Sequence, residues 1–215
     1  MHDAGLDLTS ERQRALQITS KQRRGQAKAN LIRDRQSFID ADPYPWPWNG
    51  ELDPTRMCLL VAGVQRVHAD ASPTAHEVAT VIDGLAVVLR RSGATVCHVR
   101  HTAPSGPSLG RPRPLLPSLG DEGWAPVLRP AHDDLVVTAS GHDGFCGSGL
   151  DLELRARRID LIVAVGMAAE VAVSCTVRSA NDRGYESLTL SEATAPLDGS
   201  TGARELHSVT MSGGI

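Results

Sequence analysis

The sequence has little net charge and no long apolar run. Its 215 residues contain 22 Lys and Arg against 25 Asp and Glu, which gives a formal net charge of −3 and a sequence pI near 6.2. This balance argues against nucleic acid or an anionic membrane as the main partner. No apolar run could span a bilayer, and the opening MHDAGLDLTSERQR lacks the apolar core of a signal peptide. We therefore expect a cytoplasmic protein that binds small molecules or other proteins.

Cysteine is scarce, and its spacing is not that of a metal site. The four cysteines are Cys58, Cys97, Cys146 and Cys175. All four fall on or beside apparent core elements, so we interpret them as buried thiols. A metal site built from His98 and His101 is also poor, because side chains three apart on a strand face opposite sides. We expect no metal and no other cofactor.

The chain divides into an N-terminal piece, residues 1–50, and an α/β domain, residues 51–215. The first piece is polar and rich in helix formers, and it ends in DADPYPWPWNG, whose prolines break helix repeatedly. We predict a helical arm followed by a Pro/Trp tether. The basic cluster in the arm fits a solvated face or a strap over a neighbouring subunit better than a nucleic-acid contact.

Strand and helix patterns alternate along residues 51–215. Buried strands are predicted at 57–65, 95–100, 135–139, 161–165 and 186–190, with helices between them, a turn at Gly166 and a helix stop at Gly184. Residues 101–134 are predicted to form a long loop rich in Pro and Gly, of the kind that covers a binding site. The pattern predicts an α/β fold, a three-layer α/β/α Rossmann-like sandwich around a central, mainly parallel sheet.

One stretch carries a recognisable motif. GMAAEVAVSCTVRSANDRGY, residues 166–185, follows the pattern Gly-x-x-Thr-Asp-Val-Cys-Val-x-x-Thr-x-Arg-x-Ala-x-Asp-Arg-Gly-Tyr, and YPWPWNGELDPTR and SGGI also fit. The chain from about Pro45 onward thus resembles the isochorismatase-like cysteine hydrolase family. The likeness is strongest to amide-cleaving members such as biuret and ureidoacrylate hydrolases and nicotinamidases.

The resemblance implies three site positions. In such enzymes the first strand supplies an Asp base, the third a Lys, and the helix after the fourth a Cys nucleophile. Residue by residue, these positions are Gly63, Ala139 and Ala172 here. A thiol attacks a carbonyl as a thiolate and needs a neighbouring base or cation to form it. The resemblance therefore implies that the family's amidase mechanism is lost, and Gly63 also removes the Asp that isochorismatases use for vinyl-ether cleavage.

Other ionisable residues lie close to these positions in the sequence. His68 follows the first strand, His142 lies three residues past Ala139, and Glu170 lies two before Ala172. We take these three as the candidate acids and bases, because imidazoles suit proton transfer near neutral pH. Each has an alternative interpretation as an ordinary solvated residue. Cys175 could be a displaced nucleophile only if its side chain reached the pocket.

Substrate contacts are expected around the same edge. Arg100 could bind a carboxylate through its guanidinium fork together with His101. Backbone amides at the helix start form an anion site. The full set of expected substrate-binding residues is Gln65, Arg100, His101, Phe145, Ala168, Ala169, Val171 and Ala172.

Two functions remain open at this point. The first is a repurposed enzyme, possible in specialised biosynthesis, that acts on a small carbonyl or carboxylate metabolite by non-covalent acid/base chemistry: proton transfer, elimination, cyclisation or hydrolysis. The second is a catalytically inactive pseudoenzyme that binds a small molecule or serves as a scaffold for a partner enzyme. In either case the resemblance implies a homo-oligomer, a dimer or a tetramer.

Overall fold

The computed structural model describes residues 52–102 and 123–197. The predicted arm and tether, most of the predicted loop and the C-terminal SGGI lie outside the described residues. The division into 1–50 and 51–215 therefore stays a prediction. No helix in the described ranges has both the length and the apolar character that crossing a membrane requires.

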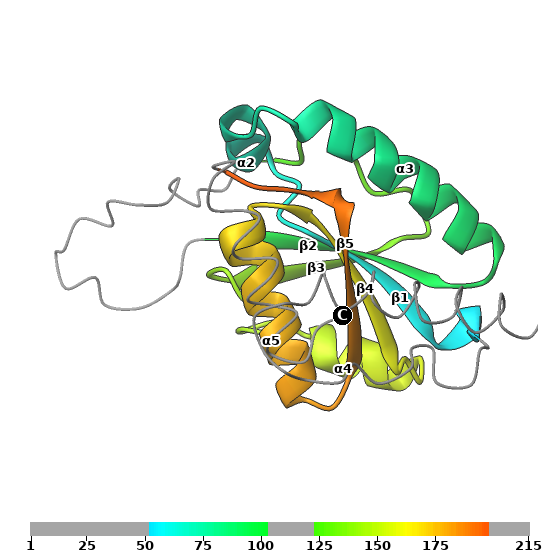
Figure 1. Cartoon of the computed structure of the whole chain (residues 1–215). Coiled ribbons are helices and arrows are strands. Elements are labelled where there is room, and N and C mark those ends of the chain that lie inside the picture. Colours follow the sequence, from blue (N-terminus) through cyan, green and yellow to red (C-terminus); the bar gives the residue numbers. More distant parts are fainter. Residues whose placement is uncertain (1–51, 103–122, 198–215) are drawn as a thin grey trace, which may run out of the picture. The chain divides into compact units, whose positions relative to one another are not determined.

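A five-stranded, all-parallel sheet forms the centre of the domain (Figure 1). Its order is β3-β2-β1-β4-β5. The strands are β1 Met57–Ala62, β2 Thr95–Thr102, β3 Leu135–Ser140, β4 Leu161–Met167 and β5 Glu186–Ala195. Every residue of β1 and β4 is buried, which is why MCLLVA and LIVAVGM read as continuous apolar runs rather than alternating ones. At the edge, β3 alternates in burial instead.

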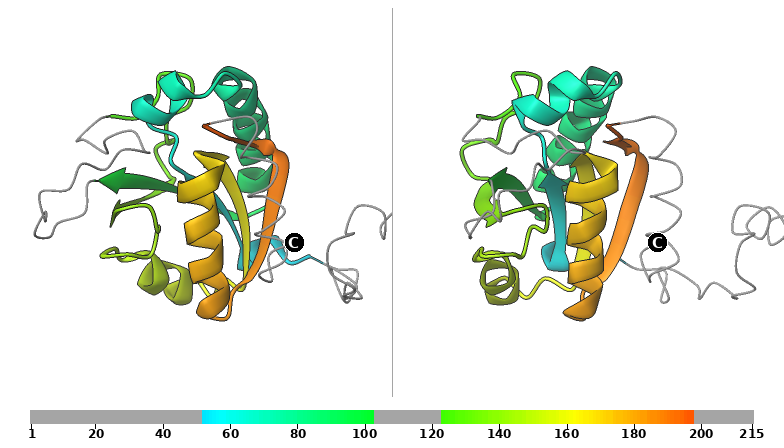
Figure 2. Two further views of the ribbon diagram at one scale, coloured as in Figure 1. Left: turned by 60° about the vertical axis from the view of Figure 1, so that its left-hand side comes forward. Right: turned by 90° about the vertical axis from the view of Figure 1, so that its left-hand side faces the viewer.

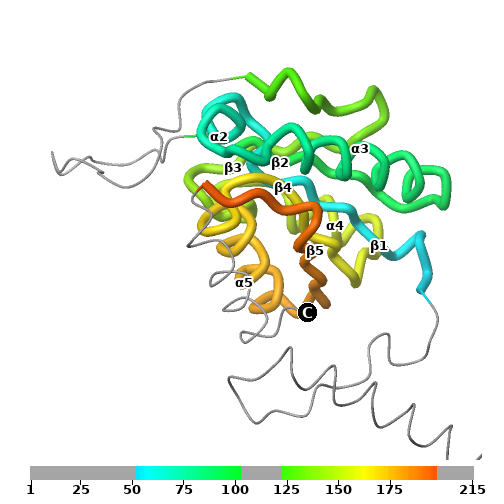
Figure 3. The backbone as a smooth tube through the Cα atoms, turned by 45° about the horizontal axis from the view of Figure 1, so that its top comes forward, coloured from blue at the N-terminus to red at the C-terminus, as the bar shows by residue number. Residues whose placement is uncertain are grey.

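Helices cover both faces of this sheet, so the predicted three-layer α/β/α fold is confirmed (Figure 2). They are α2 Arg66–Ala71, α3 Ala75–Arg91, α4 Leu150–Ala156 and α5 Ser174–Asp182, with a 3-10 turn η1 Pro54–Arg56 and a π-helical turn η2 Ala169–Val173. Figure 3 shows α2 and α3 on one side of the strands and α4 and α5 on the other. The main apolar core lies on the α4 and α5 side, where Leu150, Leu154 and Val177 pack against the sheet.

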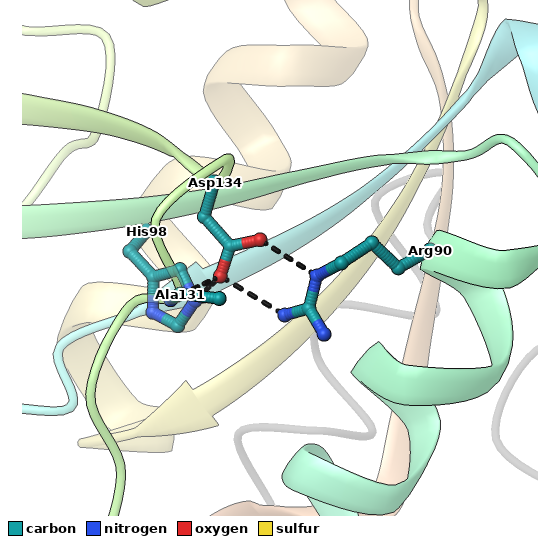
Figure 4. Close-up of polar contacts among 4 residues, drawn as sticks. All are labelled: Arg90, His98, Ala131 and Asp134. Atoms are coloured by element: carbon teal, nitrogen blue, oxygen red, sulfur yellow. Dashed lines mark hydrogen bonds and ion pairs between the residues drawn. The ribbon is translucent and has the colours of Figure 1, made fainter.

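A carboxylate joins α3 to the sheet (Figure 4). Asp134 accepts two hydrogen bonds from Arg90, through Nε at 2.9 Å and Nη2 at 3.0 Å. It also accepts from His98 Nε2 at 3.1 Å and from the Ala131 amide at 2.8 Å. Its side chain is 1% exposed. Burial acts to raise the pKa of Asp134, but the Arg90 bonds outweigh it and hold that pKa below its ordinary value.

Three sequence predictions of local structure were wrong. Gly166 is not a turn but lies within β4, where its φ of +140° lets β1 approach so closely that a Cβ would sit 1.9 Å from the Ala62 carbonyl oxygen. The turn comes two residues later, at Ala168, which is left-handed with φ +58°. Helix α2 was not predicted. Strand β5 continues past residue 190 to Ala195 through a bulge opposite Val165.

Candidate active site

The positions assigned to the triad converge on one edge of the sheet. Gly63 follows β1, and a Cβ built on it would lie 3.0 Å from the Cβ of Ala172. Ala139, near the end of β3, is the register partner of His101 in β2. Ala139 and Ala172 are at most 1% exposed, and both belong to the apolar core cluster. Gly63 therefore lies against Ala172, and Ala139 and Ala172 share one apolar cluster.

Gly63 has a backbone that disfavours any side chain. Its φ is +67°, and an added Cβ would approach the Met167 carbonyl oxygen to 2.8 Å and His68 Nδ1 to 3.1 Å. Contacts under 3.0 Å to backbone cannot be relieved by a rotamer change. Glycine is therefore required by the local structure here.

His68 is brought to this point by α2. The helix begins at Arg66, three residues after Gly63, and the His68 side chain is fully buried. His68 Nδ1 lies 2.7 Å from the Gly63 carbonyl oxygen. Because a carbonyl can only accept, Nδ1 carries the hydrogen and Nε2 is the basic nitrogen of the neutral ring.

His101 has the same tautomer. Its Nδ1 donates to the Gly141 carbonyl at 3.0 Å, and its ring is fully buried. Its Nε2 has no hydrogen-bond partner among the described residues. Burial lowers the pKa of His101 to about 4, opposed by the Gly141 bond and assisted by the nearby charges of His68 and His142. His68, from α2, and His142, from the loop after β3, are therefore close enough to affect the ionisation of His101.

Gln65 positions His101 rather than presenting its own amide to a ligand. Its Nε2 donates to the His101 carbonyl at 2.8 Å, and its Oε1 accepts from the His101 amide at 2.7 Å. Gln65 is fully buried, and its backbone forms an isolated bridge with Trp124. Both ends of the amide are thus engaged, which differs from the substrate contact expected from the sequence.

His142 lies on a loop that is fastened to α5. The Gly144 amide donates to Thr176 Oγ1 at 2.9 Å, and Thr176 Oγ1 donates to the Ala172 carbonyl at 2.6 Å. Ser179 Oγ donates to Asp143 Oδ2 at 2.9 Å. These bonds fix the loop backbone on both sides of His142, whose side chain is half-buried. Sequence reasoning did not single out Thr176, although it fills the Thr position of the 166–185 motif.

The start of the helix after β4 uses some of the amides expected to bind an anion. The Val171 and Ala172 amides donate to the Ala168 carbonyl at 3.0 and 2.9 Å. Glu170, half-buried, accepts a bond from the Leu197 amide on Oε2 at 3.0 Å. The carboxylate therefore ties the chain after β5 to this turn.

Two expected substrate contacts, Phe145 and Arg100, have surroundings of their own. Phe145 is 6% exposed and packs in the core, stacked on Tyr185 at 6.0 Å with the Arg183 guanidinium 4.6 Å above its ring. Arg100 precedes His101 on β2, and successive strand residues point to opposite faces. Its face is that of His98, toward α3. The structure thus does not bring Arg100 and His101 together as a carboxylate clamp.

The residues that the structure describes include no group of three His, Cys, Asp or Glu side chains placed to hold a metal ion. Of the cysteines, Cys58 and Cys97 are buried, Cys175 is half-buried and Cys146 is exposed. Exposure of Cys146 corrects the expectation that all four thiols are buried.

The sequence of this domain matches a known family model. The isochorismatase domain model covers residues 57–214. The chain belongs to the isochorismatase family. Its described sheet, helices and edge of converging strand ends are therefore those of an isochorismatase-family domain.

Curated relatives of this isochorismatase-family chain include hydrolases. It is 31% identical over 153 residues to the ureidoacrylate amidohydrolase RutB of Variovorax paradoxus, covering 65% of this chain and 60% of that protein. It is 29% identical over 143 residues to the streptothricin hydrolase of Streptomyces noursei, covering 65% and 50%. The uncharacterized isochorismatase family protein YrdC of Bacillus subtilis is 24% identical, with 65% and 74% covered. The matches thus span about half to three quarters of these relatives.

Solved structures agree. An isochorismatase family protein from Burkholderia thailandensis superposes with a TM-score of 0.66 at 25% identity, covering 76% of this chain and 90% of that one. The N-carbamoylsarcosine amidase from Thermoplasma acidophilum gives 0.59 at 27% identity, covering 74% and 94%. The fold and the family are therefore shown by independent comparisons.

Proposed function

We propose that this isochorismatase-family protein is an enzyme that acts on a small carbonyl-containing metabolite by moving protons with histidines. The observation that carries the proposal is the convergence of His68, His101 and His142 at the edge where the strands end. Ligands of open α/β sheets bind outside the carboxyl ends of the strands. The reaction would be a proton transfer, an elimination, a cyclisation or a hydrolysis by activated water.

The tautomers support this assignment. Backbone carbonyls hold the Nδ1 hydrogens of His68 and His101, so each neutral ring keeps its lone pair on Nε2. A positioned imidazole of this kind contributes typically about 10²–10⁴-fold to a proton-transfer step. His101, with a pKa of about 4, stays neutral at physiological pH and serves as a hydrogen-bond acceptor for substrate. We assign proton transfer to His68 and His142.

The proposal excludes a covalent acyl intermediate. We infer that Gly63, Ala139 and Ala172 stand where cysteine hydrolases of this family keep their Asp, Lys and Cys. None of the three carries a nucleophile, an acid or a cation, and Gly63 is required by its own backbone. Losing the whole set avoids the cost, about 3–5 kcal/mol, of leaving one buried charge without its partner.

Glu170 is the third candidate for proton transfer, after His68 and His142. Its Oε2 accepts the Leu197 amide, so the carboxylate already holds the chain after β5. We test it with the others. Ligand contacts at the helix start are assigned to the Ala168 and Ala169 backbone, because the later amides bond within the turn.

The test uses substitutions that preserve the structural hydrogen bond. Asparagine places an N–H close to the position of histidine Nδ1, so His68→Asn retains the bond to Gly63 while removing Nε2. The full-length protein and its His68→Asn, His142→Asn and Glu170→Gln variants would be followed by NMR against amides, ureides, enol ethers and oxo acids. We expect turnover by the wild type to fall about 100-fold or more in at least one histidine variant.

The matched control is His132→Asn, an exposed histidine before β3. It should leave turnover unchanged. Full turnover in all three site variants would refute the residue roles. Loss of turnover in Cys175→Ser alone would point instead to a displaced thiol nucleophile.

A non-catalytic binder or scaffold is the second candidate. One observation favours it: Ala139, Ala168 and Ala172 are at most 1% exposed and pack within the apolar core. Binding of a metabolite with no conversion, measured by calorimetry and NMR on the same sample, would support this alternative over the enzyme.

A further inference from the structure

The outward face of α3 carries a row of residues that the fold itself does not use. Val81 and Val88 are 45% and 59% exposed. Glu77, Gly84 and Arg91 are also exposed. At about 100° per residue, these five positions fall within an arc of about 80°. We call them the α3 stripe.

The presence of glycine at position 84, inside helix α3, is not explained by contacts among the described residues. A glycine inside a helix costs about 1 kcal/mol relative to alanine. A Cβ built on Gly84 would meet nothing within 4 Å, so packing among the described residues does not require its absence. Glycine is favoured where another backbone approaches closely. The residue therefore points to a partner across the outer face of α3.

The stripe is nearly symmetric about this glycine, since Val81 lies three residues before it and Val88 four after it. Glu77 lies seven residues before Gly84 and Arg91 seven after it, with Val81 and Val88 between. Neither Glu77 nor Arg91 takes part in an ion pair within the described residues. An acidic end, an apolar middle and a basic end of equal length are complementary to the same stripe running in the opposite direction.

We propose that a second copy of this chain docks on the α3 stripe, with the two helices antiparallel and crossing at Gly84. A two-fold axis at that point places Glu77 against the partner's Arg91 and Val81 against the partner's Val88. This is an isologous contact, in which the same patch serves both subunits. It is independent of the chemistry proposed above.

The size of the contact sets its strength. Helix α3 has 17 residues, a length of about 25 Å. One helix pair buries less than the roughly 1,200 Å² of a stable specific interface, so the dimer forms with a dissociation constant in about the micromolar range. The charged ends make the association sensitive to salt.

A cysteine at the axis tests the geometry. Helix axes about 8–10 Å apart, with Cα radii of about 2.3 Å, place facing Cα atoms about 4–5 Å apart, which a disulfide can bridge. Full-length Gly84→Cys protein, in a Cys146→Ser background, would be oxidised mildly. We expect a covalent dimer with an 84–84 linkage identified by mass spectrometry. The control is Leu152→Cys on α4, an exposed position (72%) on the opposite side of the sheet.

Equal cross-linking of the two variants would overturn the proposal. So would a monomer in which the cysteine at position 84 resists alkylation, because another segment of the same chain would then cover the stripe.

A charge exchange provides the second test. Glu77→Arg and Arg91→Glu should each weaken self-association about tenfold in low salt, because each places like charges together twice in the dimer. The double variant restores both pairs and should regain the wild-type dissociation constant. Sedimentation velocity over a concentration series measures all four proteins. Unchanged single variants, or a double variant no better than the singles, would refute the antiparallel arrangement.

Discussion

Gly63 ends β1 with a positive φ and with the Met167 carbonyl oxygen within 2.8 Å of any Cβ. We predict that Gly63→Ala lowers the free energy of unfolding by about 2–4 kcal/mol, since left-handed strain and overpacking each cost about 1–3 kcal/mol. Urea unfolding of the full chain measures the change. Gly63→Asp should be worse and should not create an amidase.

Gly149 provides the matched control for this substitution. It is the N-cap of α4, its φ is −86°, and a Cβ there meets nothing within 4 Å. Gly149→Ser should be neutral or stabilising by a few tenths of a kcal/mol, because serine is a preferred N-cap. If the two glycines tolerate a side chain equally well, the strain argument at Gly63 is wrong.

Single residues were predicted from the sequence with mixed success. Gly63, Ala139 and Ala172 were chosen from the family resemblance, and parallel topology accounts for the ends of β1 and β3 lying at one edge of the sheet. The role of Gln65 did not follow, since its hydrogen-bond partner is 36 residues away and no local pattern indicates it. The packing of Phe145 did not follow either, because Tyr185 and Arg183, which contact its ring, are distant in sequence.

At the scale of elements, the Asp134 carboxylate joins α3, β2 and the segment before β3. We predict that Asp134→Asn destabilises the protein by about 3 kcal/mol. The substitution removes the negative charge that pairs with Arg90 and accepts the hydrogen bond of His98, and the Asp134 side chain is only 1% exposed. Thermal and urea unfolding measure this loss. The neighbouring Asp133 is exposed, so Asp133→Asn should change stability by less than about 0.5 kcal/mol.

Elements were predictable where burial is simple. The apolar runs of β1 and β4 identified both strands. The errors had two causes. Gly166 was interpreted as a turn, but it allows β4 to lie close to Ala62 of β1. Helix α2 has only six residues, too few for a clear helical pattern. Exposure of Val81 and Val88 could not be foreseen, because helical spacing does not state which face a sheet will cover.

At the scale of the whole molecule, buried histidines make stability depend on pH. Burial lowers the pKa of His101 to about 4 and also lowers that of His98, so the unfolded chain binds more protons than the folded one below about pH 6.5. Stability is therefore complete above that pH and falls as the solution is acidified toward pH 4. The His101 contribution is on the order of 3 kcal/mol.

Unfolding free energies at a series of pH values check this window. The slope between about pH 6.5 and 4 should be shallower in His101→Asn, which cannot be protonated but retains an N–H for Gly141. A slope identical to that of the wild type would show that His101 is not the titrating group. Asp134, whose pKa is lowered, loses its contribution only below about pH 4.

The side-chain amide of Gln65 completes the sheet edge as a peptide group would. Because it donates to and accepts from the same residue, only an uncharged primary amide fits: a carboxylate would face the His101 carbonyl with like charge, and a hydrocarbon would leave two backbone groups unsatisfied. The backbone of His101 is thus held by a single neutral amide, and Gln65→Glu would replace one of its two hydrogen bonds with repulsion between two oxygen atoms.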